Sequence, residues 1–294
     1  MEERRDIHSA RSRIGDAIFV IVCVIISLMC IVPMLNLLAK SLSGTDYLIK
    51  REVYLWPKGF NLDAYLHVLK DPKYIKAFFW TAFLTVGCTL LSLTMTMLCA
   101  YPLIFEQLKG RKAINIFITI TMFFNAGIIP NYLLLQRIGM LDTAWALVIP
   151  SCMSVYNMII MRSFFYGIPV SLRESAQIDG ASVTRILFSI YVPLSKPVIA
   201  TLALFYAVGR WNGYSDALMY IKNKDLYPLQ LLLYNILNNI NSVEVATQEG
   251  FSSPGLSEAI KCAIVMFSTI PILCIYPFLQ KYFISGVTLG AVKE

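Results

Sequence analysis

The chain is poor in charge. Only 15% of its 294 residues are Asp, Glu, Lys or Arg, whereas 57% are hydrophobic and the mean hydropathy is +0.64. Soluble domains carry about 25% charged residues, so a soluble globular protein is excluded. The apolar residues come in blocks too long for core helices, which indicates one integral membrane domain with the lipid bilayer as its solvent.

Residues that bind metals or form disulfides are also scarce. The two histidines, His8 and His67, are isolated, and no pair of cysteines has zinc-like spacing. The seven cysteines all lie in apolar blocks, where they resemble small buried hydrophobes: Cys23, Cys30, Cys88, Cys99, Cys152, Cys262 and Cys274. We therefore expect neither a metal site nor a disulfide framework.

A phosphate-binding loop of the form Gly-x-x-x-x-Gly-Lys-Ser/Thr is missing as well. We expect no cofactor on this chain and ATP hydrolysis elsewhere. The net charge of +7 is spread over short segments between apolar blocks and forms no basic stripe, which argues against a nucleic-acid partner. Membrane topology explains the basic residues better.

Five uncharged stretches are long enough to cross the hydrocarbon layer: 17–38, 77–105, 113–136, 143–161 and 262–280. A sixth, 196–218, is apolar through Val208 and carries Arg210 and Asp216 near its end, where we expect these charges to snorkel towards water. The sequence thus predicts an all-α integral membrane protein with six transmembrane helices in one domain, 17–282.

The distribution of lysine and arginine predicts the orientation of these helices. The first apolar block is longer than a cleavable signal and lacks a convincing cleavage site, so we expect it to be retained. A cytoplasmic amino terminus places most basic residues of the short segments on the cytoplasmic side. Both termini, 1–16 and 283–294, then lie in the cytoplasm, and two long segments, 39–76 and 217–261, lie outside. A leucine and isoleucine stripe over 227–240 indicates an outer amphipathic helix that packs on the bundle.

The cytoplasmic segment 167–194 is too polar to lie in lipid. Its signals for the start and end of a helix also argue against a flexible linker. Ser171 and Glu174 have the spacing of a capping box, which predicts that a short helix begins there. Gly180 is the expected left-handed residue after that helix. A second helix over 186–191 should stop before Pro193. Local chemistry alone favours an ordinary helical hairpin.

The same segment resembles the EAA loop of ABC importer permeases. Glu174-Ser175-Ala176, three residues, Gly180, nine residues and Ile190-Tyr191-Val192-Pro193 resemble Glu-Ala-Ala, three residues, Gly, nine residues and Ile-x-Leu-Pro. Ser175 and Val192 depart from this pattern by small changes in volume. Further resemblance to the carbohydrate-type, maltose-permease-like branch extends along nearly the whole chain, including Trp56-Pro57, Trp211-Asn212 and 286–290, and is greatest to polysaccharide and complex-oligosaccharide permeases.

This resemblance implies a type I ABC importer permease in a bacterial cell membrane. Its expected partners are a second homologous permease, two ATPase subunits that bind ATP-Mg, an extracytoplasmic solute-binding protein that contacts 217–261, and membrane lipid. The helix before Gly180 would be a coupling helix between crossings four and five. The residues expected to couple to the ATPase are Glu174, Ser175, Ala176, Asp179, Gly180 and Pro193.

Sugar sites combine aromatic faces with hydrogen-bonding groups. Residues of both kinds lie in or near the crossings, and these substrate-path candidates are Asn125, Tyr132, Asn157, Tyr206, Trp211, Asn212 and Tyr214. Helix packing and interfacial anchoring are alternative roles for each of them. The alternative function is a secondary transporter or channel without ATPase subunits, although the five uncharged crossings lack the ionisable groups typical of ion coupling. A membrane enzyme would need a cluster of catalytic groups that the sequence does not contain.

Overall fold

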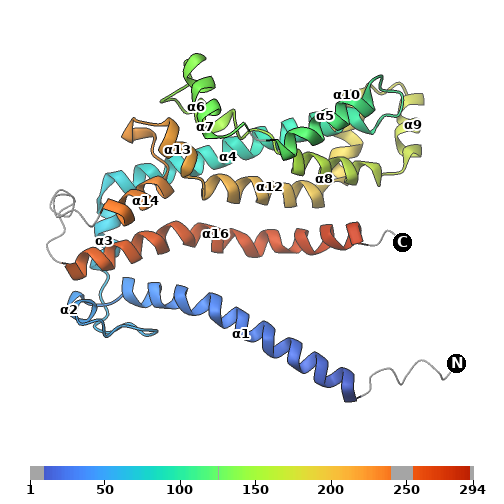
Figure 1. The fold of residues 1–294 in the computed structure, drawn as a ribbon. Helices are drawn as coiled ribbons and strands as arrows, with labels where there is room; N and C mark the ends of the chain where they lie inside the picture. Colours follow the sequence, from blue (N-terminus) through green and yellow to red (C-terminus); the bar gives the residue numbers. More distant parts are fainter. Residues whose placement is uncertain (1–9, 125, 240–253, 292–294) are drawn as a thin grey trace. The chain divides into compact units, whose positions relative to one another are not determined.

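The computed structural model describes residues 10–124, 126–239 and 254–291, and these residues form helices joined by loops (Figure 1). Within these ranges the strand-like pairing is limited to an isolated β-bridge between Ser43 and Phe60. The predicted all-α class is confirmed. Asn125 and the parts of the predicted segments that fall on 1–9, 240–253 and 292–294 lie outside the described residues. The chain divides into two compact units.

The first unit contains residues up to Asp71 and residues 236–267. It comprises α1 (Ala10–Ser41), α2 (Thr45–Ile49), α3 (Asp63–Lys70) and the first part of α16 (Pro254–Ala291). Polar groups at the end of α1 join these helices: Lys40 donates to Glu258 at 2.7 Å, and the hydroxyls of Ser41 and Tyr65 are 2.8 Å apart. The apolar span of α1 is not buried within the chain, as expected for a helix that faces lipid or another subunit.

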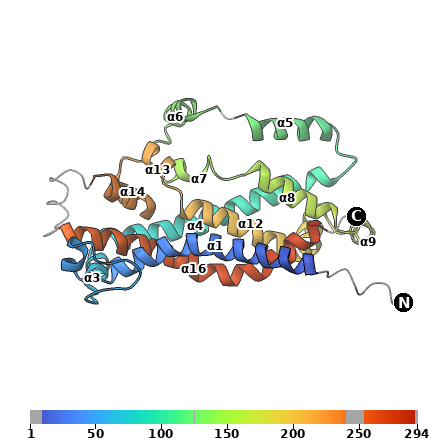
Figure 2. The same ribbon diagram turned by 60° about the horizontal axis from the view of Figure 1, so that its bottom comes forward.

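The second unit contains residues 72–235 and 268–294. Its centre is a bundle of α4 (Pro72–Ala100), α8 (Val155–Tyr166) and α12 (Lys196–Trp211), which lie side by side in Figures 1 and 2. Buried apolar residues from all three helices form one core, with Leu93, Met161 and Leu202 among them. A short 3-10 turn, η1 (Pro102–Ile104), ends α4.

Two of the predicted crossings are broken in the structure. Residues 113–136 fall on α5 (Arg111–Phe123) and α6 (Ile128–Arg137), and 143–161 falls on α7 (Trp145–Val148) and α8. Pro130 and Pro150 explain the breaks, because a proline inside a continuous helix lacks an N–H and meets the carbonyl four residues earlier. Pro130 instead lies in the first turn of α6, where it is tolerated, and α8 restarts at Ser154, whose hydroxyl accepts from the Asn157 N–H.

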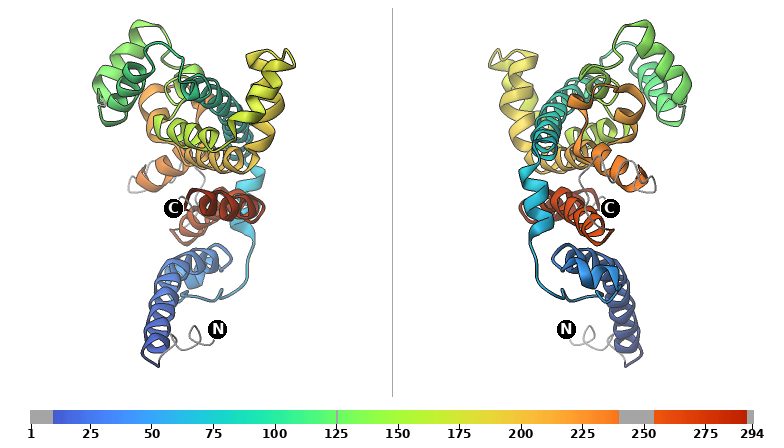
Figure 3. Two further views of the ribbon diagram at one scale, coloured as in Figure 1. Left: turned by 90° about the vertical axis from the view of Figure 1, so that its right-hand side faces the viewer. Right: turned by 90° about the vertical axis from the view of Figure 1, so that its left-hand side faces the viewer.

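The segment between α8 and α12 forms a hairpin at one end of the bundle. It contains α9 (Val170–Ile178), α10 (Val183–Ile186), the π turn η2 (Leu187–Tyr191) and α11 (Val192–Leu194). Figure 3 shows α9, in yellow, crossing the direction of the bundle helices. At the other end, α12 is followed by α13 (Ser215–Tyr220), the 3-10 turn η3 (Lys224–Leu226) and α14 (Leu229–Asn239).

Among the described residues, three helices are long and apolar enough to cross a membrane: Gly15–Ser41, Pro72–Ile104 and Gly255–Ile275. Two bent pairs raise the number to five if each pair is one span, α5 with α6 and the Val183–Leu194 helix with α12. The described residues therefore support a multi-pass membrane protein. The sixth crossing and the orientation of the termini stay predictions.

Candidate functional site: a polar cavity in the bundle

A cavity of about 490 Å³ opens between α4, α8, α12 and the start of α13. Most of its exposed lining is apolar, and hydroxyl and amide groups and one ion pair contribute the polar part. The lining residues are Cys88, Ser92, Ser151, Met153, Ser154, Asn157, Phe205, Tyr206, Gly209, Arg210, Gly213, Ser215 and Asp216. Such a surface suits a polyhydroxylated ligand, because it offers several hydrogen-bonding groups and an aromatic face.

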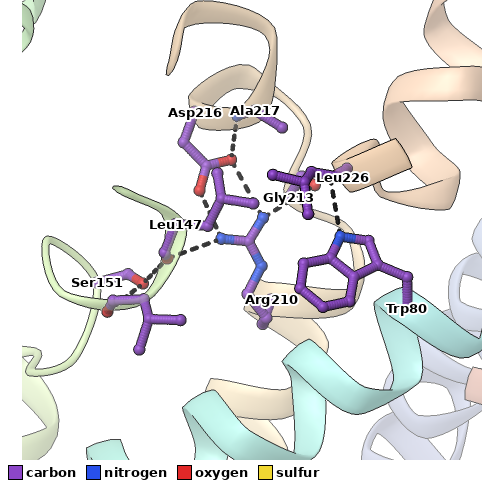
Figure 4. A network of polar contacts seen from close by, with 9 residues as sticks. Trp80, Leu147, Ser151, Arg210, Gly213, Asp216, Ala217 and Leu226 are labelled. Carbon is purple, nitrogen blue, oxygen red and sulfur yellow. Dashed lines mark hydrogen bonds and ion pairs between the residues drawn. The ribbon is translucent and has the colours of Figure 1, made fainter. Parts of the chain in front are cut away.

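Arg210 and Asp216 form the ion pair in this wall (Figure 4). The Arg210 side chain is 6% exposed and that of Asp216 is 28% exposed. Both guanidinium Nη groups donate to the carboxylate, Nη1 to Oδ2 at 2.5 Å and Nη2 to Oδ1 at 3.2 Å. The same nitrogens donate to the carbonyls of Leu147 and Gly213, so four hydrogen bonds hold the guanidinium. This bidentate geometry compensates for burying the charge.

Gly213 leaves room for the close approach of the Arg210 side chain. A Cβ atom at this position would lie 2.9 Å from Nη2 and 3.2 Å from Cζ of Arg210. The short connection between α12 and α13 therefore folds around the guanidinium. This turn fixes the bend after Trp211, where a continuous helix over 196–218 was expected.

The snorkelling role expected for Arg210 and Asp216 is wrong. Both side chains turn inward and pair across the turn. The carboxylate of Asp216 accepts from two guanidinium N–H groups of Arg210, which would otherwise donate to water. The serine residues of the cavity were also missed by the sequence analysis. A signal existed in the spacing of Arg210, Gly213 and Asp216, which allows two opposite charges to meet over a glycine turn.

Two of the predicted substrate-path residues line this cavity. Asn157 is 6% exposed and lies in the first turn of α8. The hydroxyl of Tyr206 is 2.7 Å from that of Thr96 on α4 and accepts from the backbone N–H of Ser154 at 3.1 Å. Tyr206 thus joins all three bundle helices, and its hydroxyl is occupied by structural hydrogen bonds. Asn157 forms no side-chain hydrogen bond within the described residues, so its amide is the better candidate for contact with a ligand.

The other candidates that the structure describes do not line the cavity. Trp211 is buried against Phe78, with ring centroids 5.6 Å apart, and its indole donates to the Ser268 carbonyl at 2.9 Å. Asn212 accepts from Gln230 at 3.5 Å. These contacts give both residues packing roles.

Tyr214 and Tyr132 lie in aromatic pairs on the unit. Tyr214 stacks on Tyr234 with centroids 4.8 Å apart, and Tyr132 lies 6.4 Å from Tyr220 at a tilt of 33°. The rings of Tyr214 and Tyr132 thus each already contact another aromatic ring. Asn125 lies outside the described residues.

The segment 167–194, which is predicted to couple to an ATPase, begins differently from the prediction. Helix α9 begins at Val170 after Pro169, and no side chain caps it. The predicted Ser171–Glu174 capping box is therefore wrong: the fixed backbone of Pro169 starts the helix two residues before the position that the box requires. Glu174 and Ser175 are exposed, whereas Ala176 packs against the bundle core.

The predicted end of this helix is confirmed. Gly180 has a left-handed backbone with φ 77. Its N–H donates to the Gln177 carbonyl at 3.0 Å, and the N–H of Ala181 donates to the Ala176 carbonyl at 2.9 Å. These two bonds define a Schellman motif. Asp179 precedes the motif and is exposed, so Glu174, Ser175 and Asp179 all present polar groups to the outside.

The second helix of the segment does not stop before Pro193. It begins at Ser182, whose hydroxyl accepts from the Arg185 N–H, and continues through η2 and α11 to Leu194. The π turn over Leu187–Tyr191 shifts the hydrogen-bond register by one residue directly before Pro193. This shift accommodates a proline that cannot donate a hydrogen bond.

A second polar feature ties the loops at the opposite end of the unit. Asp142 has φ 60, its N–H donates to the Tyr220 carbonyl at 2.8 Å, and one carboxylate oxygen accepts from the N–H groups of Lys222 and Asn223. The backbone hydrogen bonds from Asn223 and Lys222 lower the pKa of the exposed Asp142 carboxyl. The ionised carboxylate therefore holds the loop after α6 to the loop after α13.

Among the described residues, no group of three or more His, Cys, Asp or Glu is placed to hold a metal ion. The cavity provides binding groups, and the α9 hairpin provides an exposed helical end. Both lie within the second unit.

Comparison with known proteins identifies relatives along the full chain. Residues 79–287 match the family described as "Binding-protein-dependent transport system inner membrane component". The chain is 38% identical to Protein LplC of Bacillus subtilis (strain 168), and the alignment covers 100% of both proteins. It is 36% identical to the polygalacturonan/rhamnogalacturonan transport system permease protein YtcP of the same organism, over 96% of this chain and 99% of that protein.

A solved structure has the same fold. It is the crystal structure of a bacterial ABC transporter involved in the import of the acidic polysaccharide alginate. One of its chains superposes with a TM-score of 0.88 at 32% identity, over 94% of this chain and 99% of that chain.

Proposed function

Because the chain belongs to the family of binding-protein-dependent transport system inner membrane components, we propose that it forms half of the membrane pathway of an ATP-driven oligosaccharide importer. The chain is an ABC importer permease. Its cargo is an oligosaccharide or polysaccharide fragment delivered by an extracytoplasmic binding protein. The observation that carries this proposal is the match over 94% of the chain to a permease chain of an alginate importer.

The substrate class is further supported by the relatives and by the cavity. The relative YtcP is named for transport of polygalacturonan and rhamnogalacturonan, and the cavity offers Ser92, Ser151, Ser215 and Asn157 together with the ring of Phe205. We assign the cavity to the substrate path, with Asn157 as a direct contact and Tyr206 as a residue that holds the walls.

The assembly follows from the same family. We propose a complex of this chain with a second homologous permease, two ATPase subunits that bind ATP-Mg, and the binding protein, which contacts segment 217–261. The coupling residues are Glu174, Ser175, Ala176, Asp179, Gly180 and Pro193. The exposed Glu174, Ser175 and Asp179 on or directly after α9 support this assignment. We also propose six crossings, with both termini on the cytoplasmic side as the distribution of lysine and arginine predicts.

The test is reconstitution of the complex in proteoliposomes. In a panel of neutral and uronate-containing fragments, one class of oligosaccharide should be taken up in an ATP-dependent manner. Asn157→Ala should raise the sugar concentration that gives half-maximal uptake by roughly 5- to 150-fold, the range for one lost buried hydrogen bond. The control Asn131→Ala, an exposed residue of α6, should match the wild type.

Uptake by this chain without ATPase subunits would contradict the proposal and favour a secondary transporter or channel. Hydrolysis of ATP by the purified chain alone would contradict the placement of ATP-Mg on partner subunits. An unchanged half-maximal concentration for Asn157→Ala would remove the cavity from the substrate path while leaving the importer assignment intact.

A further inference from the structure

Arg173 lies on the inner side of α9, facing the helices of the bundle. Its guanidinium carbon is 4.9 Å from the ring centroid of Phe105, which follows η1. The side chain also interacts with the hydroxyl of Tyr191 in η2. Its Nε atom is buried and has no hydrogen-bond partner in the described ranges. An arginine normally keeps its head in water, so this inward placement requires the aromatic contact.

Phe105 belongs to a cluster of aromatic rings from three parts of the bundle. This ring cluster consists of Tyr101, Phe105, Phe165 and Tyr191. The centroid of Tyr101 lies 5.1 Å from Phe105, 6.2 Å from Phe165 and 5.0 Å from Tyr191, and Phe165 and Tyr191 are 5.4 Å apart. All four contacts have edge-to-face geometry, which aromatic pairs prefer.

The ring cluster lies in the buried core of the unit. Tyr101, Phe165 and Tyr191 are each at most 3% exposed, and they belong to the core shared by α4, α8 and α12. Closely packed side chains transmit displacement because they cannot be compressed. A force on Phe105 therefore reaches the ends of α4 and α8.

Most of α9 has no comparable contact with the bundle. Ile178 is 87% exposed, and Leu172, Glu174 and Ser175 also face outward. Ala176 packs on the core, but its side chain is a single methyl group. Arg173 is the long side chain of α9 that reaches the ring cluster.

We propose that Arg173 is a positioning residue that links the coupling helix α9 to the ring cluster, so that displacement of α9 by the ATPase moves α4 and α8. This inference rests on the proposed coupling function of segment 167–194. The contact depends on the flat guanidinium, which stacks on an aromatic face in a way that a lysine ammonium does not. It acts together with the backbone connections at either end of α9.

The experiment measures sugar imported per ATP hydrolysed in proteoliposomes that contain the full complex, with each variant compared at matched ATPase copurification. Arg173→Ala should lower this ratio at least about three-fold, as expected from loss of one cation–π contact. Phe105→Leu should lower it similarly from the opposite side of the contact. The double variant should be no worse than the more severe single variant, and Arg173→Lys should lie between Arg173→Ala and wild type.

Arg137→Ala is the matched control, because Arg137 is an exposed arginine at the end of α6, outside the coupling segment. Its ratio should equal that of the wild type. A wild-type ratio for Arg173→Ala overturns the proposal, as does a double variant whose losses multiply. If Arg173→Ala does not assemble, Phe105→Leu decides, and a wild-type ratio for that variant also overturns it. Failure of the wild-type chain to bind an ATPase would instead refute the proposed function.

Discussion

Removing the negative charge of Asp216 should destabilise the protein far more than removing an exposed carboxylate. Asp216→Asn leaves the Arg210 guanidinium, 6% exposed, without its ionic partner. Breaking a buried pair from one side costs about 3–5 kcal/mol. Because Asp216 is 28% exposed and water reaches it, we expect about 3 kcal/mol, the lower end of that range.

The chain contains a matched control for this substitution. Lys76 and Asp225 form an ion pair of 2.7 Å, but their side chains are 60% and 70% exposed. Asp225→Asn makes the same chemical change and should cost less than about 1 kcal/mol. Replacing both members of the buried pair, Arg210→Met with Asp216→Leu, should recover most of the loss, because no charge is then left buried.

The free energy of unfolding is measured for each variant by titrating the purified protein in mild micelles with a denaturing detergent. Equal losses for Asp216→Asn and Asp225→Asn would refute the reasoning, since burial would then not matter. A double variant less stable than Asp216→Asn would show that the pair contributes net stability of its own and that the unpaired charge is not the main cost.

Three further predictions concern other parts of the chain. Asp142→Asn should lower thermal stability at neutral pH but not in acid, because the pKa of the wild-type Asp142 carboxyl is lowered in the folded state. The wild-type advantage is therefore present above the unfolded-state pKa near 4 and disappears as the pH falls through the folded-state pKa. A difference in stability that persists in acid would contradict this. Gly180→Val should abolish sugar uptake at normal membrane abundance, because a β-branched side chain at φ 77 costs on the order of 1–3 kcal/mol. Gly180→Asn should retain uptake, since asparagine tolerates the left-handed conformation. Equal uptake by both variants would assign the segment to an ordinary linker. In a cysteine-free background, an impermeant thiol reagent on intact cells should label Lys58→Cys but not Ser182→Cys, and the reverse pattern would invert the topology.

The long uninterrupted helices could be predicted from the sequence because their apolar runs dominate every local signal. The range 17–38 lies within α1 and 262–280 lies within α16. Gly180 was also predictable, since a glycine after a short helical pattern has few other uses. These features depend on neighbouring residues alone.

The features that the sequence did not reveal depend on residues brought together by folding. Ser171 and Glu174 have capping-box spacing, but Pro169 starts the helix earlier. Residues 143–161 were expected to form one crossing, yet α7 ends at Val148 and α8 begins at Val155, with Pro150 between them. Arg210 is charged and near a helix end, so its burial follows from Asp216, a partner on the next helix. Tyr206 and Asn157 were both candidates, but their different roles follow from Thr96, which is 110 positions away from Tyr206.

The hydrogen bonds of the Tyr206 hydroxyl bear on how this permease can acquire a new cargo. Any change at Tyr206 loosens three helices at once, so mutants there would lose transport of every sugar and would be mistaken for mutants of recognition. Met153 and Phe205 line the same cavity with side chains that make no such hydrogen bonds. If the cavity is the substrate path proposed above, changes of specificity should arise at these two neighbours, where a new side-chain shape alters the fit of the sugar and keeps the hydrogen bonds between the helices.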